Sequence, residues 1–332
     1  MLVLLATASL SLRGRALVIQ VNACVALASA LLGAAQVSLG EAGPHLYAAS
    51  NTGVVGFQAN KNAEADVLLI GLVALAAALA PALDVGRAGA RASSGRRAAW
   101  IMLAGGAVVL LFATLLTNSR MGIVLIPVAV MGAWAILAAG GVGVLGVRRP
   151  LVWLPLALMA AAGGAAVLAE VNLALGAVFS RFAVHDDFRR ELWRDGWFAL
   201  TRSWPSGIGV GGAEQALMAA ERLEVVRPSE PNRVHNDYLE FVLEGGVLAI
   251  AVLLAGAGLA GRAAWREWRA RAGDRAQIVL GCAVLAILAL HSLVDYPLRS
   301  MALACLGGVA AGLLAPSPVR DPAATPLRGA TG

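Results

Sequence analysis

The chain has 332 residues, of which 59% are hydrophobic, and a mean hydropathy of +0.76. Soluble domains are closer to half apolar, so this composition indicates a membrane protein. A formal charge of +6 often suggests a nucleic-acid partner. Here, however, the arginines concentrate in short loops between apolar runs, where they indicate membrane topology, and we expect no nucleic-acid partner. The three cysteines lie in apolar runs and predict neither a disulfide framework nor a metal site.

Apolar runs near the ~20 residues of a membrane-spanning helix follow one another along the chain. They cover residues 16–39, 67–82, 100–116, 123–144, 152–173, 238–259, 278–294 and 301–314. Residues 1–12 are also apolar but lack the features of a signal peptide, so we interpret them as the end of a truncated N-terminal helix. The sequence thus predicts an all-α, polytopic transmembrane bundle of about eight spans plus that stub.

The positive-inside rule orients these spans, because the arginine-rich short loops all fall on one side if the spans alternate. They contain Arg13, Arg15, Arg87, Arg91, Arg96, Arg97, Arg148, Arg149, Arg262, Arg266, Arg269, Arg271 and Arg275. The opposite, outer side holds residues 40–66, 117–122, 174–237 and 295–300, with 174–237 as a long loop inserted between spans. Residues 1–316 then form the membrane domain, and residues 317–332, rich in Pro, Ala and Gly, form a disordered cytoplasmic tail.

The stretch 233–246, RVHNDYLEFVLEGG, stands where the long outer loop gives way to an apolar run. Asp237 and Glu240 have the spacing of a capping box, with Asp237 as N-cap and Glu240 reaching back to it. A helix start presents N–H groups and a partial positive charge. The pattern therefore places the side chains of His235 and Asn236 beside a site that favours anions. The alternative is an ordinary interfacial cap with a solvated histidine.

Three arginines are candidate anion ligands on the outer side. Arg120 lies in a short turn between two spans, where it either extends to the water boundary or is held rigidly for an anion. In the long loop, FRRELWRDGWFAL predicts an amphipathic helix suited to a membrane interface. Its apolar stripe is Phe188, Leu192, Trp193, Trp197 and Leu200. Arg190 and Arg194 share a face of that helix, either around an anion or as a solvated face in which Glu191 pairs with Arg194.

Further polar groups flank these elements. Asn60, Lys61 and Asn62 precede a span and either hold sugar hydroxyls or phosphate, or cap the helix. In HSLVDYPLRS, His291 and Asp295 are four residues apart, as on one helix face. The glycine-rich run 207–212 follows no predicted strand, so it is not a nucleotide-binding fingerprint, and we interpret it as a mobile turn that folds over a ligand.

Five of these motifs, in this order, resemble the O-antigen ligase family. They are GFQANKNAEA, the TNSR turn, the R-x-x-W element Arg190–Trp193 with WPSGIGVGG, the HNDYLE element, and HSLVDYPLR. Each is weak alone, but the ordered set on one predicted face is specific. The sequence departs from the family where Met121, rather than glycine, follows Arg120.

The resemblance implies a C-type, inverting glycosyltransferase of the bacterial inner membrane with a periplasmic active site. It would move a glycan from a polyprenyl-diphosphate carrier to a hydroxyl of lipid A-core, a polysaccharide or a protein, without metal, nucleotide or other cofactor. An O-antigen or exopolysaccharide polymerase is one alternative. A transporter of lipid-linked glycan and a non-enzymatic scaffold are alternatives from other classes.

The candidate residues fit that chemistry, because fixed arginines and a helix start can neutralise a departing diphosphate. Arg120 and Arg190 are the expected diphosphate ligands, with Arg194 beside them. His235 is either the base for the acceptor hydroxyl or a phosphate ligand, since an imidazole titrates near neutral pH. The expected substrate-binding set is Arg194, Asn60, Lys61, Asn62, Asn236, Asp237, Tyr238 and Glu240.

Overall fold

The computed structural model describes residues 1–44, 46–47, 53–84, 93–142, 189–222, 233–270 and 274–316. Ten α-helices and two short 3-10 helices occupy these ranges, and no strand occurs within them. The all-α prediction is therefore confirmed for the described part of the chain. The predicted tail, 317–332, lies outside it.

Five helices are long and apolar enough to cross a membrane. They are α2 (Leu12–Leu39), α3 (Lys61–Leu83), α4 (Ser93–Leu116), α5 (Arg120–Ala139) and α10 (Asp237–Ala270). Two further apolar helices, α11 (Arg275–His291) and α12 (Met301–Leu313), are shorter, and α1 (Leu2–Ser9) corresponds to the predicted stub. Seven of the eight expected spans thus coincide with helices, five of them of spanning length, while the run 152–173 lies outside the described residues.

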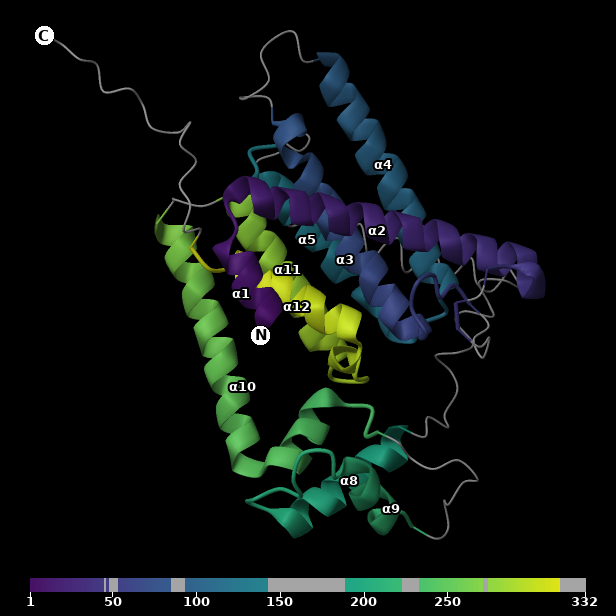
Figure 1. Ribbon diagram of the computed structural model, residues 1–332, viewed down its shortest axis with the longest axis vertical. Helices are drawn as coiled ribbons and strands as arrows, with labels where there is room; N and C mark the ends of the chain where they lie inside the picture. The colour runs from purple at the N-terminus through teal and green to yellow at the C-terminus, as the bar shows by residue number, and fades with distance from the viewer. Residues whose placement is uncertain are drawn as a thin grey trace, which may run out of the picture.

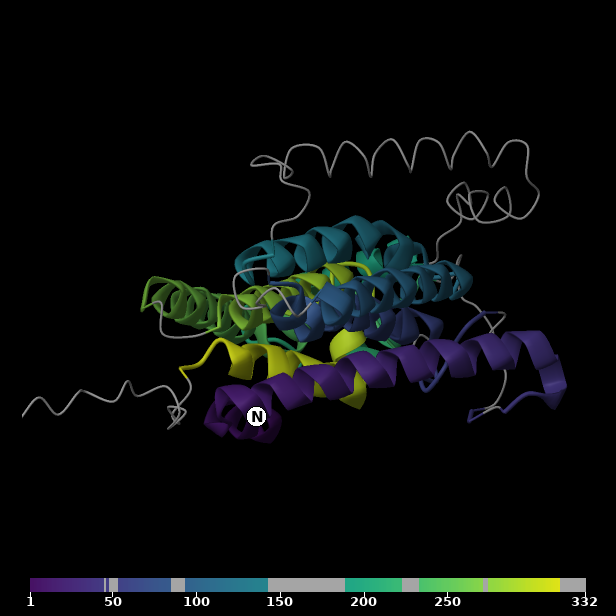
Figure 2. The same ribbon diagram turned by 90° about the horizontal axis from the view of Figure 1, so that it is seen from above.

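Helix α3 forms the centre of the bundle, in contact with α2, α4, α5 and α11 (Figure 1). In its most apolar stretch 72% of the residues are buried, against 22–33% in the other four candidate spans. Small residues allow this close packing. A Cβ added to Gly71 would lie only 2.2 Å from the Cβ of Ala26 on α2, and α2 runs along one side of the bundle in Figure 2.

The start of α3 extends six residues beyond its predicted apolar run. Asn60 caps the helix, because its Oδ1 accepts a hydrogen bond of 2.7 Å from the N–H of Asn62. Glu64 and Asp66, both fully buried, then lie inside the helix. The polar head of α3 is therefore part of the protein interior rather than part of an outer loop.

Arg15 does not lie in a cytoplasmic loop as predicted. It lies within α2 and is only 2% exposed. Its guanidinium donates to the carbonyl oxygens of Ala8, at 2.9 Å, and Ala315, at 2.8 Å. Arg15 thereby joins the end of α1, the start of α2 and the end of α12.

A second, smaller core lies at one end of the bundle, where α8 (Arg189–Ser203) and α9 (Ala213–Ala220) pack against the start of α10 (Figure 1). It contains Ala199, Leu200, Ala213, Leu217, Val234 and Leu243. The predicted amphipathic helix of the long loop is confirmed as α8, whereas its apolar stripe is divided. Leu200 is buried against protein, but Trp197 is 61% exposed.

Helix α10 is two helical segments joined by a kink at Gly246, where φ is 57° and ψ is −139°. The glycine-rich turn packs into that kink. The Pro205 carbonyl accepts from the N–H of Val247 at 2.9 Å, and the N–H of Gly209 donates to the Glu244 carbonyl at 3.0 Å. A Cβ on Gly246 would lie 2.0 Å from the Pro205 oxygen, so only glycine fits. The interpretation of this run as a loose turn over a ligand is wrong, because it is anchored to α10.

Candidate functional site

Helix α10 begins with a cap that differs from the predicted capping box. Asn236 is the capping residue, since its Oδ1 accepts from the N–H of Leu239 at 3.0 Å. The carboxylate of Asp237 instead accepts from the Ser292 hydroxyl at 3.0 Å and from the N–H of Leu298 at 3.3 Å. The D-x-x-E prediction is therefore wrong in its bonding, although the helix does begin at Asp237.

His235, directly before this cap, has a left-handed backbone with φ of 55°. Its carbonyl accepts from the indole N–H of Trp193 on α8 at 3.2 Å. Its ring lies 4.7 Å from the ring of Tyr296, centroid to centroid, and Nδ1 is 3.2 Å from Oδ1 of Asp295. Three elements therefore fix the position of this imidazole: α8, the start of α10 and the segment after α11.

Asp295 is the centre of the polar network. Besides His235, its carboxylate accepts a short hydrogen bond from the side-chain amide of Asn62 and lies 3.5 Å from the guanidinium of Arg189. Burial alone would raise the pKa of Asp295, but the hydrogen bond from His235 and the charge of Arg189 outweigh it and hold the pKa below its ordinary value. Asp295 is therefore a carboxylate that orients its neighbours as an acceptor.

A second aspartate–histidine pair lies deeper in the bundle. Oδ1 of Asp66 on α3 is 2.7 Å from Nδ1 of His291, the last residue of α11. Asp66 is fully buried and His291 is 1% exposed. The sequence spacing suggested that His291 and Asp295 share a helix face, but α11 ends at His291 and the two residues bind different partners.

Glu240, in the first turn of α10, binds two arginines. Its carboxylate is 2.8 Å from both Arg233 and Arg299, and it accepts from the N–H of Val234 at 3.1 Å. Because Glu240 is fully buried, these contacts compensate the cost of burying its charge. Glu240 holds the segment that carries His235 rather than presenting itself to a ligand.

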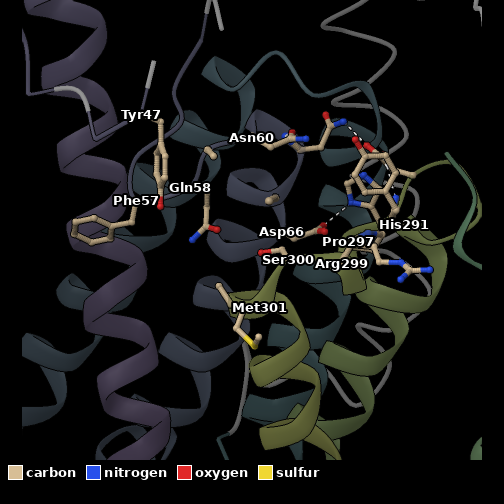
Figure 3. Close-up of a pocket in the computed structure, with 16 residues that line it drawn as sticks. Tyr47, Phe57, Gln58, Asn60, Asp66, His291, Pro297, Arg299, Ser300 and Met301 are labelled. Carbon is tan, nitrogen blue, oxygen red and sulfur yellow. Dashed lines mark hydrogen bonds and ion pairs between the residues drawn. The ribbon is translucent and has the colours of Figure 1, made fainter. Parts of the chain in front are cut away.

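A pocket of about 510 Å³ opens beside this network (Figure 3). Its lining residues are Tyr47, Phe57, Gln58, Ala59, Asn60, Asn62, Ala63, Asp66, His291, Asp295, Tyr296, Pro297, Arg299, Ser300, Met301 and Ala302. They come from the approach to α3, from α3 itself, and from the region between the end of α11 and the start of α12. His235 borders this lining through its contacts with Asp295 and Tyr296.

The structure brings together only part of the predicted set. Asn60 and Asn62 line the pocket and His235 lies at its edge, whereas Arg120, Lys61, Arg190 and Arg194 are not among its lining residues. Arg190 and Arg194 are exposed on α8.

Two other members of the predicted set bind the end of α11 and the segment that follows it. Tyr238 donates to the Ala289 carbonyl at 2.9 Å. Asn236 donates to the Leu293 carbonyl at 2.8 Å. In the structure these side chains therefore hold α10 against α11.

Two residues were missed by the sequence analysis. Arg189 makes the contact with Asp295, although only its neighbour Arg190 was singled out. Asp66 could have been identified from the sequence, because it is a carboxylate at the start of an apolar run, where a charge needs a partner.

Residues 105–254 match the model of the O-antigen ligase family. A comparison with curated proteins finds no significant match. The matched segment runs from α4 into α10 and includes Arg120, α8 and His235, so the resemblance expected from the motifs is confirmed. This match covers less than half of the chain, and it points to glycan transfer of the O-antigen ligase or polymerase type. The chain therefore carries an O-antigen ligase family domain over residues 105–254.

Proposed function

We propose that this protein transfers a glycan from a polyprenyl-diphosphate carrier to an acceptor hydroxyl, in the pocket beside His235 and Asp295. The pocket would open on the periplasmic side of the bacterial inner membrane, as the distribution of arginines predicts. The observation that carries the proposal is the pairing of His235 with Asp295 at the edge of this pocket, 3.2 Å apart.

The pairing defines what the imidazole can do. Because Asp295 accepts from Nδ1–H, the lone pair of the ring is on Nε2, which is then the basic atom. The acceptor hydroxyl oxygen attacks the anomeric carbon of the donor sugar and forms the new glycosidic bond. The bond from that carbon to the diphosphate oxygen breaks, and its electron pair leaves with the diphosphate. Nε2 of His235 takes the hydroxyl proton, and the Asp295 carboxylate stabilises the resulting imidazolium.

The departing diphosphate needs positive charge, which we propose comes from arginines in place of a metal. Arg190 lies next to Arg189, the residue that contacts Asp295, and is exposed at the start of α8. Arg194 is exposed one helical turn later. Arg120 begins α5, which packs close to the head of α3, because a Cβ on Gly122 would lie 2.5 Å from the Cβ of Ala65. Arg120, Arg190 and Arg194 are accordingly the proposed diphosphate ligands.

The direct test incubates the purified full chain, in lipid nanodiscs, with a lipid-linked glycan and with lipid A-core, polysaccharide or protein acceptors in separate reactions. A glycosylated acceptor together with released polyprenyl diphosphate is the expected result. One product of fixed size identifies a ligase, and a ladder of lengths identifies a polymerase. Movement of the lipid-linked glycan across the membrane without any new glycosidic bond would refute the proposal in favour of a transporter.

A further inference from the structure

The buried pair of Asp66 and His291 has two further polar atoms, to which the proposed transfer step gives no role. Besides the 2.7 Å contact between Oδ1 and Nδ1, each residue has a second polar atom, Oδ2 of Asp66 and Nε2 of His291. Both atoms are buried and have no hydrogen-bond partner within the described ranges. Buried polar atoms without partners are uncommon because each loses its hydration without replacement.

The position of these two atoms points to a ligand. Within the described part of the chain, the other buried side-chain atoms without a partner are Arg15 Nε, Gln36 Oε1, Trp134 Nε1 and Gln277 Oε1. None of those four residues lines the pocket, whereas Asp66 and His291 both do. Figure 3 shows the pair between Asn60 and Arg299. Asp66 and His291 line the pocket but are only 0 and 1% exposed, so at most a small group of a ligand, and not a whole ring, would contact them.

The chemistry of the pair selects the kind of group. With Asp66 ionised and the His291 ring neutral, the carboxylate accepts the Nδ1–H and the lone pair of the ring is on Nε2, so Oδ2 and Nε2 are both acceptors. Two acceptors on residues of one pocket wall match a ligand that offers O–H donors. A fully ionised diphosphate offers only acceptor oxygens and would be repelled by them. The pair is therefore suited to sugar hydroxyls and unsuited to the diphosphate.

We propose that Asp66 and His291 form a hydroxyl-binding subsite in the wall of the pocket, which positions a sugar of the glycan substrate. The proposal rests on the proposed function only in taking a glycan as the ligand. The hydroxyl belongs either to the donor sugar or to a saccharide acceptor, and the two sources are distinguished by experiment.

Asp66→Asn is the decisive variant. Its amide oxygen still accepts from Nδ1–H, so the contact between α3 and α11 is retained, but an NH₂ donor replaces the acceptor Oδ2. His291→Asn is the complementary variant, because its amide still donates to Asp66 while Nε2 is absent. Gln277→Leu is the matched control, since Gln277 is a buried polar residue at the opposite end of α11 and is not part of the pocket lining.

Binding is measured with the full chain in nanodiscs and two probes: the free oligosaccharide released from the lipid carrier, and polyprenyl diphosphate without sugar. We expect Asp66→Asn and His291→Asn to weaken oligosaccharide binding by about tenfold, as for a lost buried hydrogen bond. Binding of polyprenyl diphosphate should remain as in the unmodified protein, and Gln277→Leu should change neither. An increase in KM for the donor or for the acceptor then identifies the source of the hydroxyl.

Three results would overturn the subsite. They are an unmodified protein that binds no oligosaccharide, variants that bind it as tightly as the unmodified protein, and variants that lose both probes equally. The last result would mean that Asp66 and His291 stabilise the fold and do not bind the sugar. If the unmodified protein binds the oligosaccharide through Asp66 but transfers nothing, the subsite remains and the transferase proposal alone fails.

Discussion

His235 and Asp295 contact each other through Nδ1 and Oδ1 at 3.2 Å, although 60 residues separate them in the chain. One precedes α10, and the other lies in the short connection between α11 and α12. The orientation of the imidazole therefore depends on how α11 and α12 pack, and a change at Asp295 should affect turnover through the imidazole.

Replacement of His235 by asparagine should lower kcat by about 10²- to 10⁴-fold, the usual contribution of positioned acid–base catalysis. Asparagine tolerates the left-handed backbone at this position, whereas alanine would add strain. Its amide can also still donate to Asp295, so the main loss is Nε2. Transfer is measured with lipid-linked glycan after confirming equal membrane insertion. Turnover within tenfold of the unmodified protein would remove His235 from the mechanism.

Replacement of Asp295 by asparagine should lower kcat while leaving the KM for the donor nearly unchanged, because Asp295 acts through His235. A hydrogen bond to a charged group contributes about 1.5–3 kcal/mol, which corresponds to roughly 10- to 150-fold in rate. Steady-state kinetics with varied donor separates the two parameters. A rise in KM with an unchanged kcat would instead make Asp295 a substrate ligand.

Asp295 should also make stability dependent on pH. Its pKa is held below the ordinary value of 3.8, so ionised Asp295 stabilises the fold above that pH and loses this effect as the pH falls through the lower, folded-state pKa. The difference in Tm between the unmodified protein and Asp295→Asn should be constant above about pH 5 and should shrink below about pH 4. Thermal unfolding in detergent across this range measures it. A difference that grows on acidification would contradict the assigned charge state.

Replacement of Arg190 by alanine should raise the KM for the donor about 2- to 10-fold, and the effect should fall at high salt because Arg190 is exposed. Arg202→Ala is the matched control, since Arg202 is exposed on the same helix but lies over the ring of Phe198, at 5.2 Å. Equal effects of the two substitutions would show that α8 contributes only general positive charge and that Arg190 is no specific ligand.

Replacement of Gly246 by alanine should destabilise the protein by about 2–5 kcal/mol, because the residue has positive φ and its Cβ would overlap the Pro205 oxygen. Gly256→Ala is the matched control in the same helix, where an added Cβ meets nothing within 4 Å. Unfolding of both variants is compared in nanodiscs. A Gly246→Ala protein as stable as the control would show that the turn does not pack in the kink.

Features with a local signal were predictable from the sequence. Apolar runs predicted the positions of α2, α3, α4, α5 and α10, and the helical spacing of apolar residues in the long loop predicted α8. His235 was found because it stands beside a helix start, where the chain changes from polar to apolar. In each case the position of the helix, or of its first residue, depends only on residues that are close in the sequence.

Features set by distant contacts were not predictable. Arg189 and Arg190 are identical neighbours in the sequence, and only the rotation of α8 determines that Arg189 contacts Asp295. Asp66 finds its partner 225 residues further along the chain. The capping box failed because Ser292 and Leu298 bind the carboxylate of Asp237, which leaves Asn236 to cap α10.

The kink at Gly246 also defines where related proteins can be recombined. The N–H of Val247 binds the Pro205 carbonyl on one side of the kink, and the Glu244 carbonyl accepts from the N–H of Gly209 on the other, so an exchanged segment that carries the turn must also carry α10 past Val247. A chimera joined beyond residue 247 keeps both of these bonds within one parent sequence. A junction at residue 237, where the helix begins, would separate these partners. The turn of one protein would then have to pack against the α10 kink of another.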